Sequence, residues 1–175
     1  MNENREESIY VQLSKKSIIY YLETGKRMEQ PANLPDELTK NKAGVFVSLK
    51  KDKRLRGCIG TFMPTQKNIA LEIIENAVSA AVRDPRFSPL KLEEVDFLDI
   101  SVDVLSIPEE VDSISQLDPQ KYGVIATSGY KKGLLLPNLE GVNTVEYQIA
   151  IAMQKAGISP GENYQIQRFE VKRYY

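Results

Sequence analysis

The sequence predicts an α+β protein in which a unit of two strands, a helix and a third strand occurs twice. Three observations lead to this prediction. Several short segments alternate apolar and polar residues, most strictly over residues 98–104, as in a strand with one buried face. Two longer segments, residues 65–83 and 144–156, carry apolar residues at helical spacing. A gapless shift by 79 residues, Gly44 onto Gly123, aligns the two sets of elements in the same order, which favours an ancient duplication.

The first half is expected to begin with a helix and to continue into a hairpin, a second helix and a strand. Gly25 stands where a C-terminal cap glycine belongs, Thr65 is a suitable N-cap, and Asp84-Pro85 ends the second helix because the residue before proline avoids the helical region. The expected elements are a helix over 6–23, a loop over 31–43, strands over 45–49 and 54–60 joined by a charged turn, a helix from Thr65 to Asp84, and a strand over 98–104.

The second half repeats this order after a linker. Its expected elements are a short helix near 113–117, strands over 124–127 and 134–136, a helix over 144–156 ended by Gly157, and a last strand over 166–171. We therefore expect one domain, residues 1–175, with a first structural unit over 5–106 and a second over 107–175. The seam between two such units is a common place for a binding cleft.

Composition excludes several kinds of chemistry. The chain has 175 residues, no histidine and one cysteine, Cys58. Ser-His and Cys-His nucleophile pairs, His-ligated metals, internal disulfides and Cys-cluster metal sites are therefore excluded, and we expect neither a metal nor a cofactor. The formal net charge of −1 provides no overall positive field for nucleic acid.

The chain is expected to be cytoplasmic. Its first seven residues are polar and acid-rich, unlike a signal peptide, and no apolar run approaches the roughly 20 residues of a membrane span. A lone thiol also fits a reducing compartment.

The hexapeptide LRGCIG in the second strand is the first candidate site. Alternation along a strand would direct Leu55 and Ile59 to the core and place Arg56, Cys58 and Gly60 on the other face. Arg56 and Cys58 would then lie about 7 Å apart. A guanidinium at that range, in a partly shielded site, favours the thiolate, which is the nucleophilic form of cysteine.

Two glycines in the same hexapeptide support a functional interpretation. Gly57 and Gly60 lack side chains, so a ligand or another backbone can approach them closely. The 79-residue shift pairs residues 56–58 with Leu135, Leu136 and Pro137, so the second unit builds its strand without Arg-Gly-Cys. Function then explains the tripeptide better than the fold does. The alternative is that Cys58 is an inert buried thiol.

Two other sets of charged residues are candidates for the same site. In one interpretation Arg83 suits the C-terminus of the preceding helix and Asp84 pairs with Arg86; in the other, the two arginines that flank Asp84 form a clamp for a carboxylate or phosphate. Asp99, Ser101 and Asp103 share one face of their strand. If that strand neighbours the LRGCIG strand, Asp103 could accept a proton there; otherwise the three residues line a solvated sheet face.

The hexapeptide resembles the hallmark motif of the AMMECR-one domain family, which includes protein A of the AmmeMemoRadiSam system. Other segments match in the family's order: DPRFSPL over 84–90, GLLLP over 133–137 and KAG over 155–157. The resemblance implies an α+β fold with an antiparallel, barrel-like sheet built from two similar strand-strand-helix-strand units with flanking helices. It implies a site at Arg56, Gly57, Cys58 and Gly60, and Memo-type or radical-SAM proteins as partners. The family's biochemical activity is not established.

The predicted function is binding of a small anionic ligand or partner peptide around the LRGCIG motif, together with a Memo-type or radical-SAM protein acting in trans. Arg56, Cys58 and Arg86 would line the groove, with Arg56 holding the anion. Cys58 is the candidate catalytic residue, but whether any covalent step follows is left open. Two alternatives remain: a non-catalytic accessory protein, and an RNA-binding or regulatory protein that uses the basic hairpin 50–56.

Overall fold

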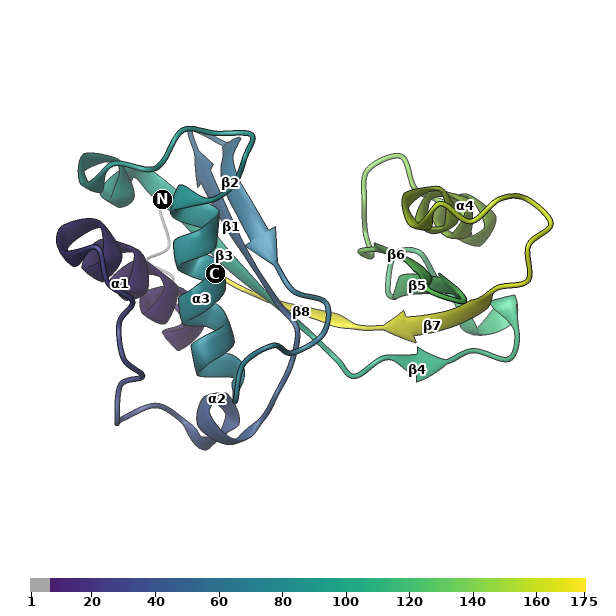
Figure 1. Cartoon of the computed structure of the whole chain (residues 1–175), viewed down its shortest axis with the longest axis horizontal. Coiled ribbons are helices and arrows are strands. Elements are labelled where there is room, and N and C mark those ends of the chain that lie inside the picture. Colours follow the sequence, from purple (N-terminus) through teal and green to yellow (C-terminus); the bar gives the residue numbers. More distant parts are fainter. Residues whose placement is uncertain (1–6) are drawn as a thin grey trace, which may run out of the picture. The chain divides into compact units, whose positions relative to one another are not determined.

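The computed structural model describes residues 7–175, which form two compact units. One contains the chain up to Val104 together with Arg173–Tyr175, and the other is Leu105–Lys172 (Figure 1). Each unit has its own four-stranded sheet, in the orders β2-β1-β3-β8 and β4-β7-β5-β6. The described strands do not close into the barrel-like sheet implied by the family resemblance, because they are divided between two open sheets that each keep two edges.

The elements follow the expected order, with some additions. In the first unit they are α1 (Ile9–Thr24), α2 (Asp36–Lys40), β1 (Val45–Lys51), β2 (Arg54–Gly60), α3 (Ile69–Val82), the 3-10 helix η1 (Leu92–Phe97), β3 (Leu98–Leu105) and β8 (Val171–Tyr174). In the second unit they are β4 (Glu109–Glu110), the 3-10 helix η2 (Ile114–Gln116), β5 (Gly123–Ser128), β6 (Lys131–Leu135), α4 (Val145–Ala156) and β7 (Gln165–Phe169). The segment 31–43, expected to be a loop, contains α2, whose Leu38 is fully buried. The segment expected to be the last strand is divided into two strands, β7 and β8, which are separated by Glu170. Among residues 7–175, no helix is long and apolar enough to cross a bilayer.

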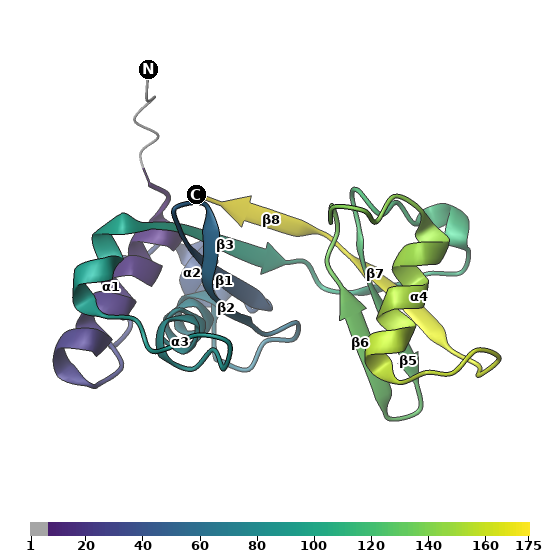
Figure 2. The ribbon, with the colours of Figure 1, turned by 90° about the horizontal axis from the view of Figure 1, so that it is seen from above.

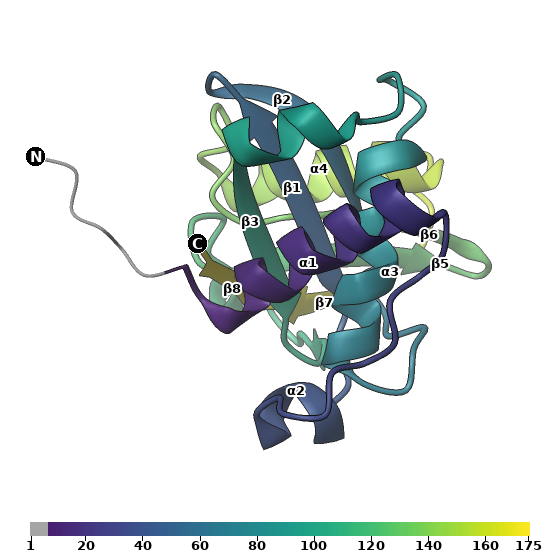
Figure 3. The same cartoon turned by 90° about the vertical axis from the view of Figure 1, so that its left-hand side faces the viewer.

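The core of the first unit follows from strand alternation. Val45, Val47 and Leu49 are fully buried on the face of β1 that α1 and α3 cover, and they lie opposite apolar residues of β3 (Figure 3). Phe46, Ser48 and Lys50 alternate with them and therefore lie on the other face. This second face of the first sheet, which we call the open face, carries the polar positions that the sequence predicts for β3.

Helix α3 begins four residues later than Thr65. Its N-cap is Asn68, whose side chain accepts from the backbone N–H of Leu71 at 3.0 Å. Thr65 instead donates to the carboxylate of Glu72 from both its N–H and its hydroxyl, at 2.8 Å each, and Gln66 N–H and the Thr61 hydroxyl donate to the same group. Because Glu72 is fully buried, it needs these four donors, and the segment between β2 and α3 folds around it instead of continuing the helix.

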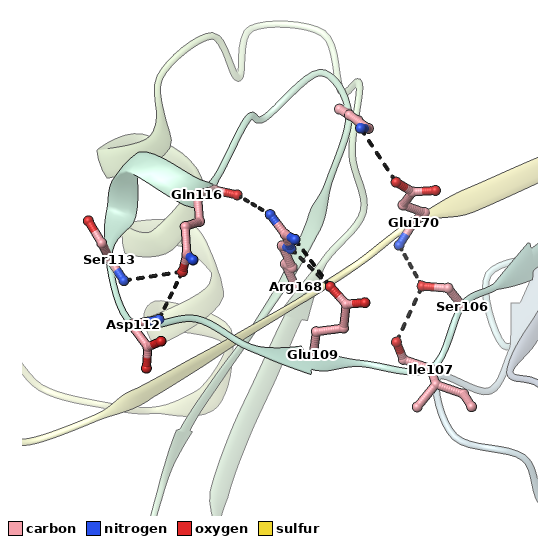
Figure 4. A network of polar contacts seen from close by, with 9 residues as sticks. Ser106, Ile107, Glu109, Asp112, Ser113, Gln116, Arg168 and Glu170 are labelled. Carbon is pink, nitrogen blue, oxygen red and sulfur yellow. Dashed lines mark hydrogen bonds and ion pairs between the residues drawn. The ribbon is translucent and has the colours of Figure 1, made fainter.

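In the second unit, α4 packs against β5 and β6 (Figure 2). Thr144 caps its start, and Gly157, with a φ of +72°, ends it. At the other edge of the sheet, Arg168 of β7 donates to the carbonyl of Gln116 at 2.6 Å and to Glu109 at 3.2 Å (Figure 4). These bonds hold the two-residue strand β4 and η2 onto β7.

In each unit a glycine of one strand lies against a helix: Gly57 of β2 against α3, and Gly133 of β6 against α4. A Cβ at Gly57 would overlap the carbonyl oxygen of Ala80 in α3, and one at Gly133 would overlap that of Ala152 in α4. The corresponding residues are therefore 76 apart (133 minus 57), not 79. On this correspondence Cys58 matches Leu134, and the glycine is required by packing in both units. The inference that the fold does not demand Gly57 was wrong, because a gapless shift misaligns the second strands. The shared element order agrees with a duplication, which stays a prediction.

Candidate functional site

The LRGCIG strand, β2, is an edge strand, and the site is built on its outer side. The backbone N–H of Thr61 donates to Val45 at 3.0 Å, and hydrogen-bonded pairs alternate along an antiparallel ladder, so the pair Ser48–Cys58 is not hydrogen-bonded. The N–H and C=O of Cys58 therefore point away from β1. An exposed edge of this kind needs partners for its backbone groups.

Asp84 and Arg86 supply those partners. Cys58 N–H donates to Asp84 Oδ2 at 2.9 Å, and Arg86 donates to the Cys58 carbonyl at 3.3 Å and to both oxygens of Asp84, at 2.9 and 2.7 Å. The Asp84 side chain is 2% exposed, and its hydrogen bond with the Arg86 guanidinium holds the pKa of the carboxyl well below its usual range. Of the two predicted roles for this pair, the structure shows the ion pair, and it adds an edge cap that the sequence did not predict.

The thiol of Cys58 lies on the open face, partly exposed. Its Sγ is 3.2 Å from the hydroxyl of Ser48, and Ser48 in turn lies opposite Ser101 on β3. Asp103 is not beside the thiol, because β1 separates β3 from β2. Two strand spacings and two residues along the strand put its backbone about 12 Å from Cys58.

Asp103 has a different partner. Arg173 of β8 donates to both of its carboxylate oxygens, at 2.6 and 2.7 Å, and the Asp103 side chain is only 4% exposed. This bidentate pair joins the C-terminal strand to the first sheet. The structure therefore does not bring Asp103 into position as a base for Cys58.

A β-bulge sets the direction of Arg56. Leu49 pairs with Gly57, and Lys50 pairs with Leu55, so Arg56 has no partner on β1. The extra residue turns Leu55 to the open face, where it is 39% exposed, whereas Ile59 packs against the core as expected. Simple alternation fails for Leu55 because it assumes a regular ladder.

The guanidinium of Arg56 is held by the segment that follows α3. It donates to Glu94 at 3.2 and 3.0 Å and to the carbonyl of Ser88 at 2.9 Å. Lys51 and the backbone N–H of Lys91 also donate to Glu94, at 3.3 and 3.0 Å. Hydrogen bonding from Arg56 is the main cause that lowers the pKa of Glu94 from 4.5 to about 2. Arg56 is thus fixed in place, and its fork faces Glu94 rather than the thiol.

This pKa shift predicts a pH dependence of stability. A carboxyl whose pKa is lower in the folded state contributes stability that is complete above its unfolded pKa and is lost as the pH falls through the folded one. For Glu94 that window runs from about 4.5 down to about 2. In urea unfolding as a function of pH, Glu94→Gln should reduce stability at pH 7 and flatten the decline within this window. If the stability of Glu94→Gln declined in acid as steeply as that of wild type, Glu94 would not be the cause of the decline.

Two open cavities border the Arg56 side chain. One, of about 490 Å³, is lined by Lys51, Asp52, Arg54, Leu55 and Arg56. The other, of about 620 Å³, is lined by Lys51, Arg56, Ser88, Pro89, Lys91, Glu93, Glu94 and Phe97. Of the predicted site residues, Arg56 borders both cavities, whereas Cys58, Gly57, Gly60, Asp84, Arg86 and Asp103 border neither. Within residues 7–175, no group of three acidic or cysteine side chains is placed to hold a metal ion.

Sequence reasoning missed several residues of this arrangement. Glu94 is one of them, because nothing local in the sequence marks it as the partner of a residue 38 positions away. A further cavity of about 520 Å³ in the second unit, bordered by Thr127, Lys132 and Tyr164, was also not predicted. Its residues come from separate strands and loops, so no spacing in the sequence could have shown it.

These features make the chain an α+β protein of two sheet-and-helix units, in which an Asp-Pro-Arg segment caps the bulged LRGCIG edge strand. The AMMECR1 family matches residues 11–174, and this chain belongs to that family. A protein of Thermotoga maritima is 51% identical over 167 residues, covering 94% of this chain and 96% of the relative. The crystal structure of the uncharacterized protein PH0010 from Pyrococcus horikoshii is similar, with a TM-score of 0.83 and 35% identity over 94% of this chain and 88% of that one.

In another relative, a region similar to this chain is part of a longer protein. The protein CA_C1420 of Clostridium acetobutylicum is 51% identical over 99% of this chain, but the match spans only 37% of its own length. More than half of that protein thus lies outside the part that resembles this chain.

Proposed function

We propose that this protein binds a carboxylate- or phosphate-bearing ligand on the surface beside the LRGCIG motif, in the cytoplasm and in concert with another protein. One observation carries the proposal: two cavities share Lys51 and Arg56 and are bordered by Arg54 and Lys91. Three acids, Asp52, Glu93 and Glu94, also border these cavities, so the four cations exceed the acids by one. On a chain of net charge −1, the local excess is therefore positive.

The contacts of Arg56 indicate how such an anion would bind. Its guanidinium is already oriented by Glu94 and Ser88, so little side-chain entropy is lost on binding. Glu94 occupies the fork formed by Nε and one terminal nitrogen. The other terminal nitrogen donates one N–H to Ser88 and has a second N–H left. An incoming anion would therefore contact Lys51 and this second N–H of Arg56, or exchange with Glu94. Packing explains Gly57, and Cys58 lies outside both cavities, so the proposal is one of binding and assigns no reaction to the thiol.

Two findings support a partner protein. The resemblance of the motifs to the AmmeMemoRadiSam system implies Memo-type or radical-SAM proteins, and the Clostridium relative carries additional sequence beside a region like this chain. The partner could supply the chemistry, with this chain as the anion-binding component. A purely accessory role without ligand binding is the alternative.

A charge-matched pair of double variants tests the proposal. Lys51→Ala with Arg54→Ala removes two cations of the site, and Lys26→Ala with Lys42→Ala removes two exposed cations elsewhere. In calorimetric titrations with citrate and inorganic phosphate at low salt, the first pair should weaken binding about tenfold, whereas the second should behave as wild type. The same titrations with a purified Memo-type protein test the partner.

Two outcomes would contradict the proposal. Equal losses in both double variants would mean that only net charge matters. Absence of anion binding with intact Memo-type binding would favour the accessory alternative.

A further inference from the structure

We propose that the anionic ligand is an extended acidic segment of a partner polypeptide that also carries an apolar side chain, rather than a free metabolite. This inference rests on the proposed function, because it names the ligand of the same surface. We call this area the hairpin surface, and it consists of Lys51, Arg54, Leu55, Arg56, Lys91 and Phe97.

The shape of the hairpin surface suits a chain-like ligand. Its two cavities measure about 490 and 620 Å³ and meet at Lys51 and Arg56, with Leu55 at one and Phe97 at the other. Each alone is within the range of small-molecule pockets. A compact metabolite would fill one of them and leave the other empty. A ligand that uses both must cross the Arg56 side chain, and an extended polypeptide, at about 3.3 Å per residue, can do so within a few residues.

The apolar residues point to the same class of ligand. Phe97 is 69% exposed and Leu55 is 39% exposed, although both lie beside charged groups. A metabolite recognised by charge alone would gain nothing from them. Protein interfaces, by contrast, derive much of their affinity from aromatic and arginine side chains close together, and Arg56 is already held rigid. An apolar side chain of the partner would cover Phe97 or Leu55 while its carboxylates meet the cations.

The charge pattern specifies an acidic segment. The hairpin from Lys50 to Arg56 contains five cations and one acid, Asp52. Glu94 accepts hydrogen bonds from Arg56 and Lys51, so these three charges largely offset one another. Asp52 and Glu93 are the other acids at the two cavities, and the remaining cations of the hairpin and the cavities are Lys50, Lys53, Arg54 and Lys91, which leaves an excess of positive charge for an acidic segment. Single-stranded nucleic acid is less well matched, because it binds along successive aromatic side chains and the two cavities offer one, Phe97.

Fluorescence anisotropy with matched peptides tests this inference. One labelled peptide alternates glutamate with leucine and phenylalanine, and the other replaces these apolar residues by serine at the same length and charge. We expect the apolar peptide to bind wild-type protein about tenfold more tightly. Phe97→Ser should remove most of that difference and leave binding of the serine peptide unchanged. The matched control is Tyr130→Ser, which removes a 96% exposed aromatic ring of the second unit and should change neither affinity.

Other outcomes separate this inference from the proposed function. If both peptides bind equally and inorganic phosphate displaces them at similar concentrations, the ligand is a small anion, and only the present inference is overturned. If labelled oligothymidylate binds more tightly than either peptide and loses affinity steeply with salt, the ligand is nucleic acid and the inference is likewise overturned. If no anionic probe binds, both proposals are overturned. Because Phe97 is exposed, Phe97→Ser should melt like wild type, and a lowered melting temperature would invalidate it as a probe, leaving Leu55→Ser to decide.

Discussion

Replacing Gly57 by alanine is expected to lower the free energy of unfolding by about 3 kcal/mol, at the upper end of overpacking effects. The added Cβ would overlap the backbone carbonyl of Ala80, which is fixed within α3 and cannot change rotamer as a side chain could. Either β2 or α3 must shift, and the core between them loses its packing. Thermal unfolding followed by circular dichroism should show a decrease in melting temperature of about 6–12 °C.

Two further variants test whether the loss of stability comes from the overlap with the helix. Gly133→Ala introduces the same overlap with Ala152 in the second unit and should destabilise that unit comparably. Cys58→Ser, one residue from Gly57, retains a group that can bond Ser48 and should stay close to wild type. A Gly57→Ala protein as stable as Cys58→Ser would show that the strand does not approach the helix this closely.

Removing the Asp84 carboxylate is expected to have an effect of similar size, about 2–4 kcal/mol for Asp84→Ala. The side chain is almost fully buried and accepts bonds from Cys58 N–H and from Arg86. Without it, the backbone donor of an edge strand loses its partner and the segment that carries Arg86 is released from β2. Urea unfolding measures the loss, and the rate at which iodoacetamide alkylates Cys58 in the native state should rise as the edge opens.

A milder substitution, Asp84→Asn, separates the charge of Asp84 from its role as a hydrogen-bond acceptor. Asp84→Asn keeps an acceptor for Cys58 but loses the charge, so its stability should lie between wild type and Asp84→Ala. Because the pKa of Asp84 is lowered in the folded protein, its contribution is present at neutral pH and declines as the pH falls. Stability of the wild type should therefore approach that of Asp84→Asn in acid. A constant difference between the two at all pH values would refute this role.

Much of the secondary structure could be predicted because its causes are local. Gly25 and Gly157 end helices as expected, since each takes the left-handed conformation that glycine adopts without strain. Strict alternation located β3 correctly. The start of α3 could not be predicted, because Thr65 is recruited by Glu72, a buried group whose need for donors outweighs the capping preference.

The candidate site, too, could be predicted from the sequence only in part. Of the residues that the sequence singled out, Cys58, Asp84 and Arg86 come together along one strand edge. The sequence could not show that Arg56 turns to Glu94, because a bulge directs it there. Asp103 would lie near the thiol only if β3 neighboured β2, and this condition is not met, because β1 lies between them. No local pattern in the sequence shows the order of strands in a sheet.

By itself the sequence determined the α+β class, the residue types in the LRGCIG and Asp-Pro-Arg segments, and the exclusion of histidine chemistry and of a disulfide within the chain. The reason is that composition and short-range periodicity are properties of the chain alone. Only the tertiary structure decided that Cys58 is held through its backbone, that Gly57 is required by α3, and that Lys51, Arg54 and Arg56 of the first hairpin border open cavities. These features depend on hydrogen bonds and packing between residues tens of positions apart, which form only when the sheet and its helix meet.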